Sequence, residues 1–229
     1  MHNPLLDTWN APYGLPPFAE TRPEHFEPAF AAAFAEHRAE LDAIAGNPEP
    51  ATFANTIAAF DRVGWKFVRI NEMFGNLTAA HTSPALEAAE RDLAPKIATH
   101  QSVVYMHQTL FARIDAVVNS AEMGQIAAED RRLAERIHLD FVRQGARIAT
   151  SKRERYAAIV AELASLSTRF SQNVLKDETD WVLWLDDEAS RAGLPADVLN
   201  AARAAAAERG RTDGCAITLS RSSVVPFLT

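Results

Sequence analysis

Hydrophobic residues recur every three or four positions over most of the chain, a spacing that places them on one face of an α-helix. The first stripe follows Thr21-Arg22-Pro23-Glu24, a capping-box pattern with proline at a helix start, and Gly46-Asn47-Pro48 ends it. The members of this stripe are Phe26, Phe30, Ala33, Phe34, His37, Leu41 and Ile44. The same spacing predicts further helices over about residues 52–80, 84–104, 111–119, 127–143 and 151–176. Ser83-Pro84 is a strong start signal for the helix at 84–104.

The helix expected at residues 151–176 has the clearest apolar stripe of all. Its members are Tyr156, Ile159, Leu163, Leu166, Phe170 and Val174. Long helices joined by short loops lie antiparallel and pack their apolar faces against one another. The fold class that follows is mostly α, a bundle of long antiparallel helices with one or two short strands near the C-terminus.

The two strands are expected where the helical spacing stops. Trp181 to Leu185 are five consecutive apolar residues that predict a buried strand, and residues 216–219 predict a second one. Leu194-Pro195 opens a short helix between them that ends at Gly210. We therefore expect three parts: an extended Pro-rich arm over residues 1–20, a long-helix bundle over residues 21–180, and a strand–helix–strand segment over residues 181–229. Four prolines exclude a long helix from the arm, whose Trp9, Tyr13 and Phe18 rings are expected to pack onto other residues.

The composition fits a folded helical protein, with 48% hydrophobic and 23% charged residues in a chain of 229. Its 23 basic and 30 acidic residues give a net charge of −7, and the basic ones are scattered, so no nucleic-acid partner is expected. No apolar run approaches the ~18–20 residues that cross a bilayer, so no membrane partner is expected either. The single cysteine, Cys215, excludes an intrachain disulfide and suits a reducing compartment. We expect a cytoplasmic location, or a periplasmic one if a signal peptide was removed.

Candidate metal ligands are few in this sequence. His37 and Glu40 are one helical turn apart and could supply two ligands, but no other residue suggests itself as the third. The favoured interpretation is that His37, which lies on the apolar stripe, makes a hydrogen bond inside the core. His100 and His107 lie about two turns, or ~10 Å, apart on a helix, which is too far for one zinc ion.

Candidate catalytic groups are equally sparse. The carboxylates of Asp177-Glu178 and of Asp186-Asp187-Glu188 are interpreted as solvated turns or helix caps. Ser220, Ser222 and Ser223 have no neighbouring histidine or lysine in the sequence to activate a nucleophile. From the residues alone, no catalytic, cofactor-binding or metal-binding residue is assigned.

Several short segments, in this order, resemble the N-terminal part of the thimet oligopeptidase/neurolysin family of zinc metallopeptidases, and most of all the bacterial peptidyl-dipeptidases. Those segments are Asn3-Pro4-Leu5-Leu6, Leu15-Pro16-Pro17-Phe18, Pro23-Glu24-His25-Phe26, Thr52-Phe53-Ala54-Asn55-Thr56-Ile57, Asp61-Arg62-Val63-Gly64, Phe141-Val142-Arg143-Gln144-Gly145-Ala146, Phe170-Ser171-Gln172-Asn173-Val174-Leu175, Ala192-Gly193-Leu194-Pro195 and Pro226-Phe227-Leu228. The sequence departs from the subgroup at two positions. Ala51 stands where the subgroup usually has proline, and at Ser222 a proline commonly precedes the serine in the subgroup.

The resemblance implies a zinc enzyme that releases dipeptides from the C-termini of oligopeptides. In that family, zinc is bound by His-Glu-x-x-His on one helix and by a glutamate on a later helix, and this motif is absent from the 229 residues. We therefore expect an N-terminal fragment that forms a wall of the substrate cleft and partners with a missing C-terminal catalytic region. Zinc is expected in the full-length parent and not in this chain, which is expected to be inactive alone and to expose an apolar patch. The alternative is a stand-alone helical module that binds a peptide or protein in a groove.

Overall fold

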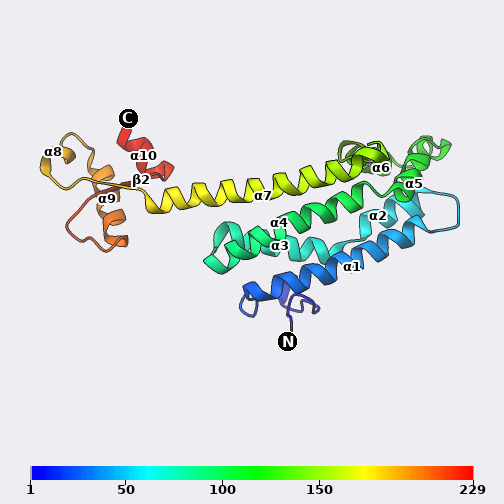
Figure 1. Cartoon of the computed structure of the whole chain (residues 1–229), viewed down its shortest axis with the longest axis horizontal. Coiled ribbons are helices and arrows are strands. Elements are labelled where there is room, and N and C mark those ends of the chain that lie inside the picture. Colours follow the sequence, from blue (N-terminus) through cyan, green and yellow to red (C-terminus); the bar gives the residue numbers. More distant parts are fainter. Residues whose placement is uncertain (1, 229) are drawn as a thin grey trace. The chain divides into compact units, whose positions relative to one another are not determined.

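The computed structural model describes residues 2–228 and is built mostly of α-helices (Figure 1). The helices are α1 Phe26–Ala45, α2 Ala58–Arg62, α3 Trp65–Ala80, α4 Pro84–Tyr105, α5 Gln108–Val118, α6 Ala128–Arg143, α7 Thr150–Asp180, α8 Glu188–Arg191, α9 Ala196–Glu208 and α10 Arg221–Leu228. Strands β1 Val182–Trp184 and β2 Ala216–Thr218 form a two-stranded antiparallel sheet in which Leu183 lies opposite Ile217. The mostly-α fold with short C-terminal strands is thus confirmed. The chain divides within α7, after Thr168, into two compact units.

Two hydrophobic cores stabilise the first unit, in which α1, α3 and α4 lie side by side (Figure 1). One core joins these three helices through Phe26, Phe30, Ile70, Phe74 and Leu93. The other joins the end of α1 to α5 and α6 and contains, among others, Leu41, Leu110, Ile114 and Phe141. The apolar stripes predicted for these helices are therefore the surfaces that pack. Each fully buried large side chain contributes about 1.5–3 kcal/mol relative to an exposed one.

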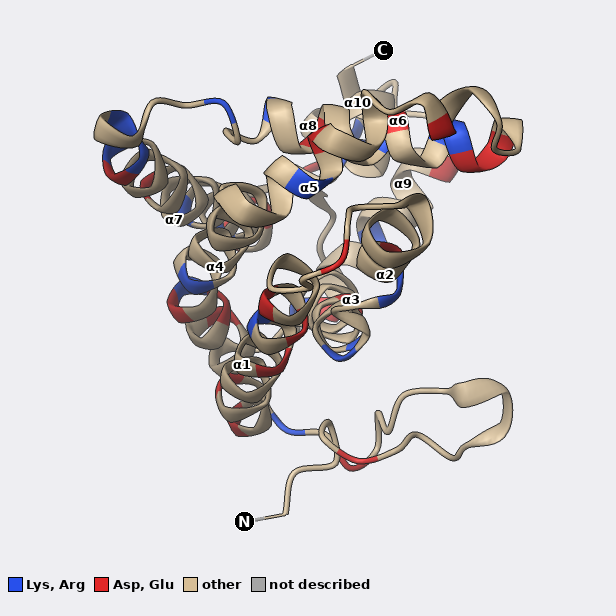
Figure 2. Cartoon of the chain, turned by 90° about the vertical axis from the view of Figure 1, so that its right-hand side faces the viewer, with Lys and Arg blue, Asp and Glu red and all other residues tan. Residues whose placement is uncertain are grey.

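Ion pairs between exposed side chains also connect α1 to its neighbours. Lys96 Nζ of α4 lies 2.5 Å from Glu27 Oε1, and Lys66 of α3 pairs with Glu36. Residues of both charge signs are interspersed along the helices (Figure 2). Exposed pairs of this kind contribute about 0–1 kcal/mol each, so the apolar cores dominate the stability of the unit.

One of the helix caps predicted from the sequence is present in the structure, and another is not. The side-chain oxygen of Ser83 accepts a hydrogen bond from the backbone N–H of Leu86, so Ser83 caps α4 as predicted. Thr21 was expected to take part in the cap of the first helix, and this is wrong. Its hydroxyl donates to the carbonyl of Pro17, and a short 3-10 turn over Pro23–His25 leads into α1 instead.

The single helix predicted over residues 52–80 is interrupted in the structure. It consists of a π-helical turn at Phe53–Ile57, then α2, and then α3, with the break at Val63 and Gly64. Val63 is extended, and Gly64 has a φ of 76°, a left-handed conformation that glycine adopts without steric cost. The apolar spacing continues across the break, which is why periodicity alone did not reveal it.

Part of the N-terminal arm, residues 1–20, packs against the helices of the first unit. Leu5 is completely buried, Asn3 Nδ2 donates to the carbonyl of His25 at 2.8 Å, and the Arg69 guanidinium lies 4.6 Å from the centre of the Trp9 ring. The packing expected of Trp9 is confirmed. Tyr13 and Phe18 are exposed, so the same expectation is wrong for them. Tyr13 lies in a tight turn with a φ of 61°.

In the second unit, the sheet packs against α9 and α10 around a small core. Leu185, Ala202, Cys215 and Ile217 are buried there, and Phe227 of α10 packs against them. Both predicted strands and the helix between them are present. The expectation that the first strand is buried is wrong, because Trp181 and Leu183 are exposed and only Leu185, just after β1, belongs to the core. The terminal helix α10 was not predicted, because Pro226 lies within it and proline usually marks a helix end.

Candidate functional site

Two histidines meet in the interior of the first unit. Nδ1 of His37 on α1 lies 3.0 Å from Nε2 of His100 on α4, and the two rings belong to residues 63 positions apart. His100 is fully buried, and the ring of Phe34 stacks on it with a centroid distance of 4.4 Å. Phe67 of α3 packs against both imidazoles. The pair is thus enclosed by aromatic rings from α1 and α3.

This environment keeps both imidazoles neutral near pH 7. Burial, together with smaller contributions from the nearby His37 and the positive charge of Arg38, lowers the pKa of His100 to about 4. Burial also lowers the pKa of His37, while the carboxylate of Glu40 opposes that shift. One neutral ring donates an N–H to the other, and Nδ1 of His100 has no hydrogen-bond partner within residues 2–228.

The interpretation of His37 as a hydrogen-bonded core histidine is therefore confirmed. Glu40, its proposed co-ligand, has a different partner, because its Oε2 accepts a hydrogen bond from the backbone N–H of Gly64 at 2.9 Å. His107 does not join the pair either. Its Nδ1 accepts from the N–H of Leu110 at the start of α5, and its Nε2 lies 3.1 Å from Asp42.

The remaining candidate side chains have structural partners. The carboxylate of Asp187 accepts from the N–H of Ser190 and caps α8, and Asp186 pairs with Arg211 at 2.6 Å. Ser223 Oγ accepts from the N–H of Thr218, and the hydroxyls of Ser220 and Ser222 lie 2.8 Å apart. None of these contacts includes a histidine or a lysine. Asp177 and Glu178 are exposed near the end of α7.

The residues present do not fit a zinc site. Within residues 2–228, no three His, Cys, Asp or Glu side chains gather in an arrangement that could hold a metal ion. No catalytic step through a metal is therefore assigned to the residues of this chain.

One face of α7 is half-buried. That face consists largely of small residues, among them Ala157, Ala161 and Ala164, and also includes Tyr156 and Val160. Ala164 and Thr168 line a cavity of about 370 Å³ that they share with residues of α3 and α4, including Phe74.

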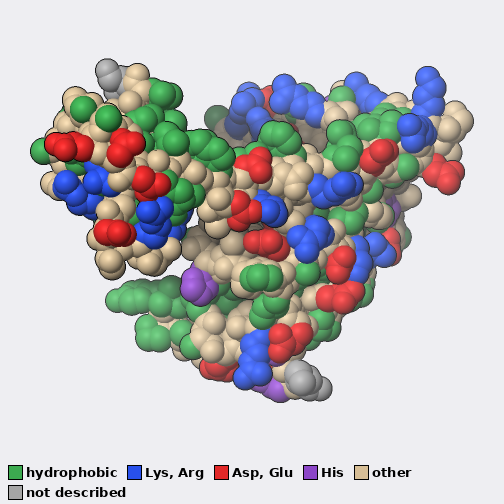
Figure 3. Space-filling view, turned by 60° about the vertical axis from the view of Figure 1, so that its left-hand side comes forward, with side chains coloured by type: hydrophobic (Ala, Val, Ile, Leu, Met, Phe, Trp, Pro, Cys, Tyr) green, Lys and Arg blue, Asp and Glu red, His purple; other side chains and the backbone are tan. Residues whose placement is uncertain are grey.

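Several large apolar residues of α7 lie on its exposed face. Ile159, Leu163 and Leu166 are 38%, 56% and 49% exposed, and we call these three residues the α7 stripe. Phe170 and Val174 continue the same spacing along the helix and are also exposed. Hydrophobic side chains that reach the surface are also visible in the space-filling view (Figure 3). The helix was predicted correctly, and Tyr156 of its stripe is half-buried. The expectation that the stripe packs into the bundle is wrong for the residues from Ile159 onward, which are exposed.

Comparisons with known proteins identify the relatives of this chain. It is 33% identical over 226 residues to dipeptidyl carboxypeptidase of Escherichia coli, and 30% identical over 229 residues to oligopeptidase A of Haemophilus influenzae. The chain is related to the thimet oligopeptidase/neurolysin family of peptidases. A plant member of this group, organellar oligopeptidase A of Arabidopsis thaliana, is 26% identical over 232 aligned residues. No protein-family model matches the chain.

The aligned region includes nearly all of this chain but only part of each relative. It includes 99% of this chain for the E. coli protein and 100% for the H. influenzae protein, yet 33% of the length of each relative. The chain therefore spans about a third of the length of the curated relatives it matches. Within the part that the structure describes, none of the helices has the length and hydrophobicity needed to cross a membrane.

Proposed function

We propose that this chain is the N-terminal helical region of a zinc peptidyl-dipeptidase, in which it forms a wall of the substrate cleft while a C-terminal region carries the zinc and the catalytic residues. The observation that carries the proposal is the similarity over the whole chain to peptidases about three times as long. Oligopeptides would then be the substrates of the full-length protein. A cytoplasmic location is part of the same proposal and is supported by the single cysteine.

The α7 stripe supports this proposal independently of sequence similarity. Ile159, Leu163 and Leu166 are large apolar side chains at consecutive helical spacing, and burying each would contribute about 1.5–3 kcal/mol. Contiguous apolar surface of this kind marks an interaction site. In the parent protein, we propose that the C-terminal region covers it.

The α7 stripe leads to a first prediction. The purified chain should bind an environment-sensitive hydrophobic dye and should self-associate, because the exposed leucines lose their contact with water in both cases. Replacing both leucines, Leu163→Gln with Leu166→Gln, should lower dye fluorescence several-fold and shift the chain towards the monomer in analytical ultracentrifugation. The matched control is Val68→Gln with Val103→Gln, two exposed apolar residues on other helices. Equal effects of the two double variants would count against the α7 stripe as a docking surface.

The catalytic part of the proposal has a direct test at the level of the gene. Reading on past codon 229 in the same frame should reveal His-Glu-x-x-His and a later glutamate on a helical segment. A stop codon immediately after Thr229 would contradict the proposal and favour a stand-alone interaction module.

A second prediction concerns the chain by itself. We expect the 229-residue protein neither to release dipeptides from a blocked tripeptide nor to retain zinc, because the described residues provide no cluster of ligands for it. Equilibrium dialysis against zinc, followed by metal analysis, measures the stoichiometry. One zinc per chain, or turnover that survives repeated purification and a chelator control, would overturn this prediction.

A further inference from the structure

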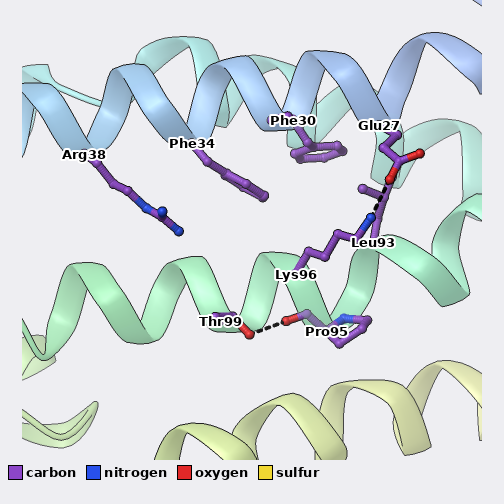
Figure 4. A pocket seen from close by; sticks show the side chains of 9 residues that line it. Glu27, Phe30, Phe34, Arg38, Leu93, Pro95, Lys96 and Thr99 are labelled. Carbon is purple, nitrogen blue, oxygen red and sulfur yellow. Dashed lines mark hydrogen bonds and ion pairs between the residues drawn. The ribbon is translucent and has the colours of Figure 1, made fainter.

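The apolar surface that a partner can reach lies on α7 and not in the groove between α1 and α4. That groove encloses about 380 Å³, with Arg38 near one end and Glu27 at the other (Figure 4). Glu27 is already paired, because Lys96 Nζ lies 2.5 Å from its Oε1. The apolar lining residues Phe30 and Leu93 are almost completely buried in the core. The residues of the α7 stripe, by contrast, are 38–56% exposed.

The exposed residues of α7 have the spacing of a coiled-coil seam. Ile159, Leu163, Leu166 and Phe170 follow one another at steps of four, three and four residues, which places them on one narrow face of the helix. In a heptad written abcdefg, they occupy the d, a, d and a positions that meet a partner helix. No helix among residues 2–228 covers this seam, since all four side chains are 38–71% exposed.

The charged residues beside the seam indicate which partner fits it. Glu162 and Arg169 occupy the g positions next to Leu163 and Phe170. Both charged side chains are exposed, and neither has a hydrogen-bond or ion-pair partner among residues 2–228. Charges at these flanking positions select the partner and the orientation of a coiled coil. The seam therefore fits a helix that carries an apolar stripe and the opposite charges in reverse order.

The α7 helix of a second copy meets this description when the two helices are antiparallel. With Leu163 of one copy opposite Leu166 of the other, Ile159 lies opposite Phe170. Each large side chain of the seam then faces another large apolar side chain. The arrangement has a twofold axis, so both copies use the same surface and make the same contacts.

The antiparallel register also matches the charges. Glu162 of each copy lies beside Arg169 of the other, and the twofold symmetry makes this pair twice. One like-charge contact, between Arg155 and Lys176, accompanies these pairs. Its cost is small, because Lys176 is already paired with Asp180 of its own helix.

A parallel arrangement of the two helices gains no ion pair at these positions. It places each g position beside an e position of the other copy, so Glu162 meets Ser167. Arg169 meets Val174 in the same way. The charges beside the seam therefore favour the antiparallel orientation.

We propose that the 229-residue chain forms an antiparallel dimer through the α7 stripe and Phe170, with Glu162 of each copy paired with Arg169 of the other. An interface with twofold symmetry is closed, so two copies complete it. The inference goes beyond the proposed function: it concerns the chain by itself, in which a second copy takes the place of the C-terminal region on the α7 stripe.

Sedimentation equilibrium of the 229-residue chain over a range of concentrations tests the proposal. The chain should be a dimer in exchange with the monomer. Glu162→Arg and Arg169→Glu should each raise the dissociation constant about tenfold at low salt, because each turns two attractive contacts into repulsive ones. Glu154→Arg makes the same change in net charge as Glu162→Arg, at an exposed position of α7 away from the seam, and should leave the dissociation constant unchanged.

Mixing the two single variants tests the orientation. The Glu162→Arg chain has arginine at both g positions and the Arg169→Glu chain has glutamate at both, so an equimolar mixture should form mainly the heterodimer, in which both ion pairs are restored. The double variant with both substitutions should regain the original dissociation constant. Circular dichroism confirms that each variant is folded.

Three results would overturn the proposed dimer. They are a chain that is monomeric at every concentration, a chain that forms larger aggregates, and a dimer whose dissociation constant none of these charge reversals changes. The proposed function does not depend on this experiment, because the reading frame beyond codon 229 decides it separately.

Discussion

Acidification from pH 7 to pH 4 is expected to destabilise the first unit by about 3 kcal/mol through His100 alone. The unfolded chain binds a proton on this imidazole near pH 6.5, whereas in the folded protein burial, with smaller contributions from His37 and Arg38, lowers the pKa of His100 to about 4. The unfolded state therefore binds more protons throughout this interval. Stability is fully present above pH 6.5 and is lost as the pH falls towards 4. His37, whose pKa is also lowered, adds to the loss in the same direction.

Chemical denaturation at a series of pH values measures this effect, and a variant separates it from the titration of carboxylates. His100→Gln removes the titrating ring and should flatten the profile by about 3 kcal/mol between pH 6.5 and pH 4. It should also cost stability at neutral pH, because Nδ1 of His37 loses its present partner. His81→Gln replaces an exposed histidine and serves as the control. If His100→Gln and the unmodified chain showed parallel pH profiles, the buried neutral imidazole would be ruled out.

The variant Gly64→Ala should destabilise the first unit by about 2–3 kcal/mol. A Cβ atom on Gly64 would lie 2.7 Å from Cε1 and 2.8 Å from Nε2 of His37. The imidazole cannot move away freely, because it is buried and bonded to His100. The left-handed φ of 76° adds a backbone cost of about 1–2 kcal/mol for any residue with a Cβ.

The control for this prediction is Gly14→Ala. Gly14 also has a left-handed φ, 68°, but a Cβ there would meet nothing within 4 Å. The difference in unfolding free energy between the two variants therefore isolates the contact with His37. Equal destabilisation by the two substitutions would show that only the backbone conformation matters at Gly64.

The sequence was sufficient for most of the secondary structure because the signals involved are local. Apolar residues at helical spacing located α4 to α7, Ser83 marked the start of α4, and five apolar residues in a row marked β1. The segments that resemble peptidases led to the relatives that the comparisons identified. The expected interior hydrogen bond of His37 was likewise correct, because buried polar side chains usually find a hydrogen-bond partner within the core.

What local signals could not provide were the partners of these elements. Nothing in the spacing of apolar residues links His37 to His100, which is 63 positions away. The spacing also does not separate α2 from α3, since the apolar stripe continues across Gly64. The groove of Arg38 and Glu27 exists only because α4 packs beside this face of α1.

The clearest contrast between sequence and tertiary structure is α7. Its sequence by itself determined that residues 151–176 lie in an amphipathic helix, because side chains three and four positions apart share a helical face, and α7 extends a few residues further. Which face packs was decided by the neighbouring helices. The small residues of α7 lie towards α3 and α4, and Leu163 and Leu166 remain exposed. Periodicity shows that a helix has an apolar side, but the free energy of burial depends on the surface that meets it, and only the tertiary structure shows that surface.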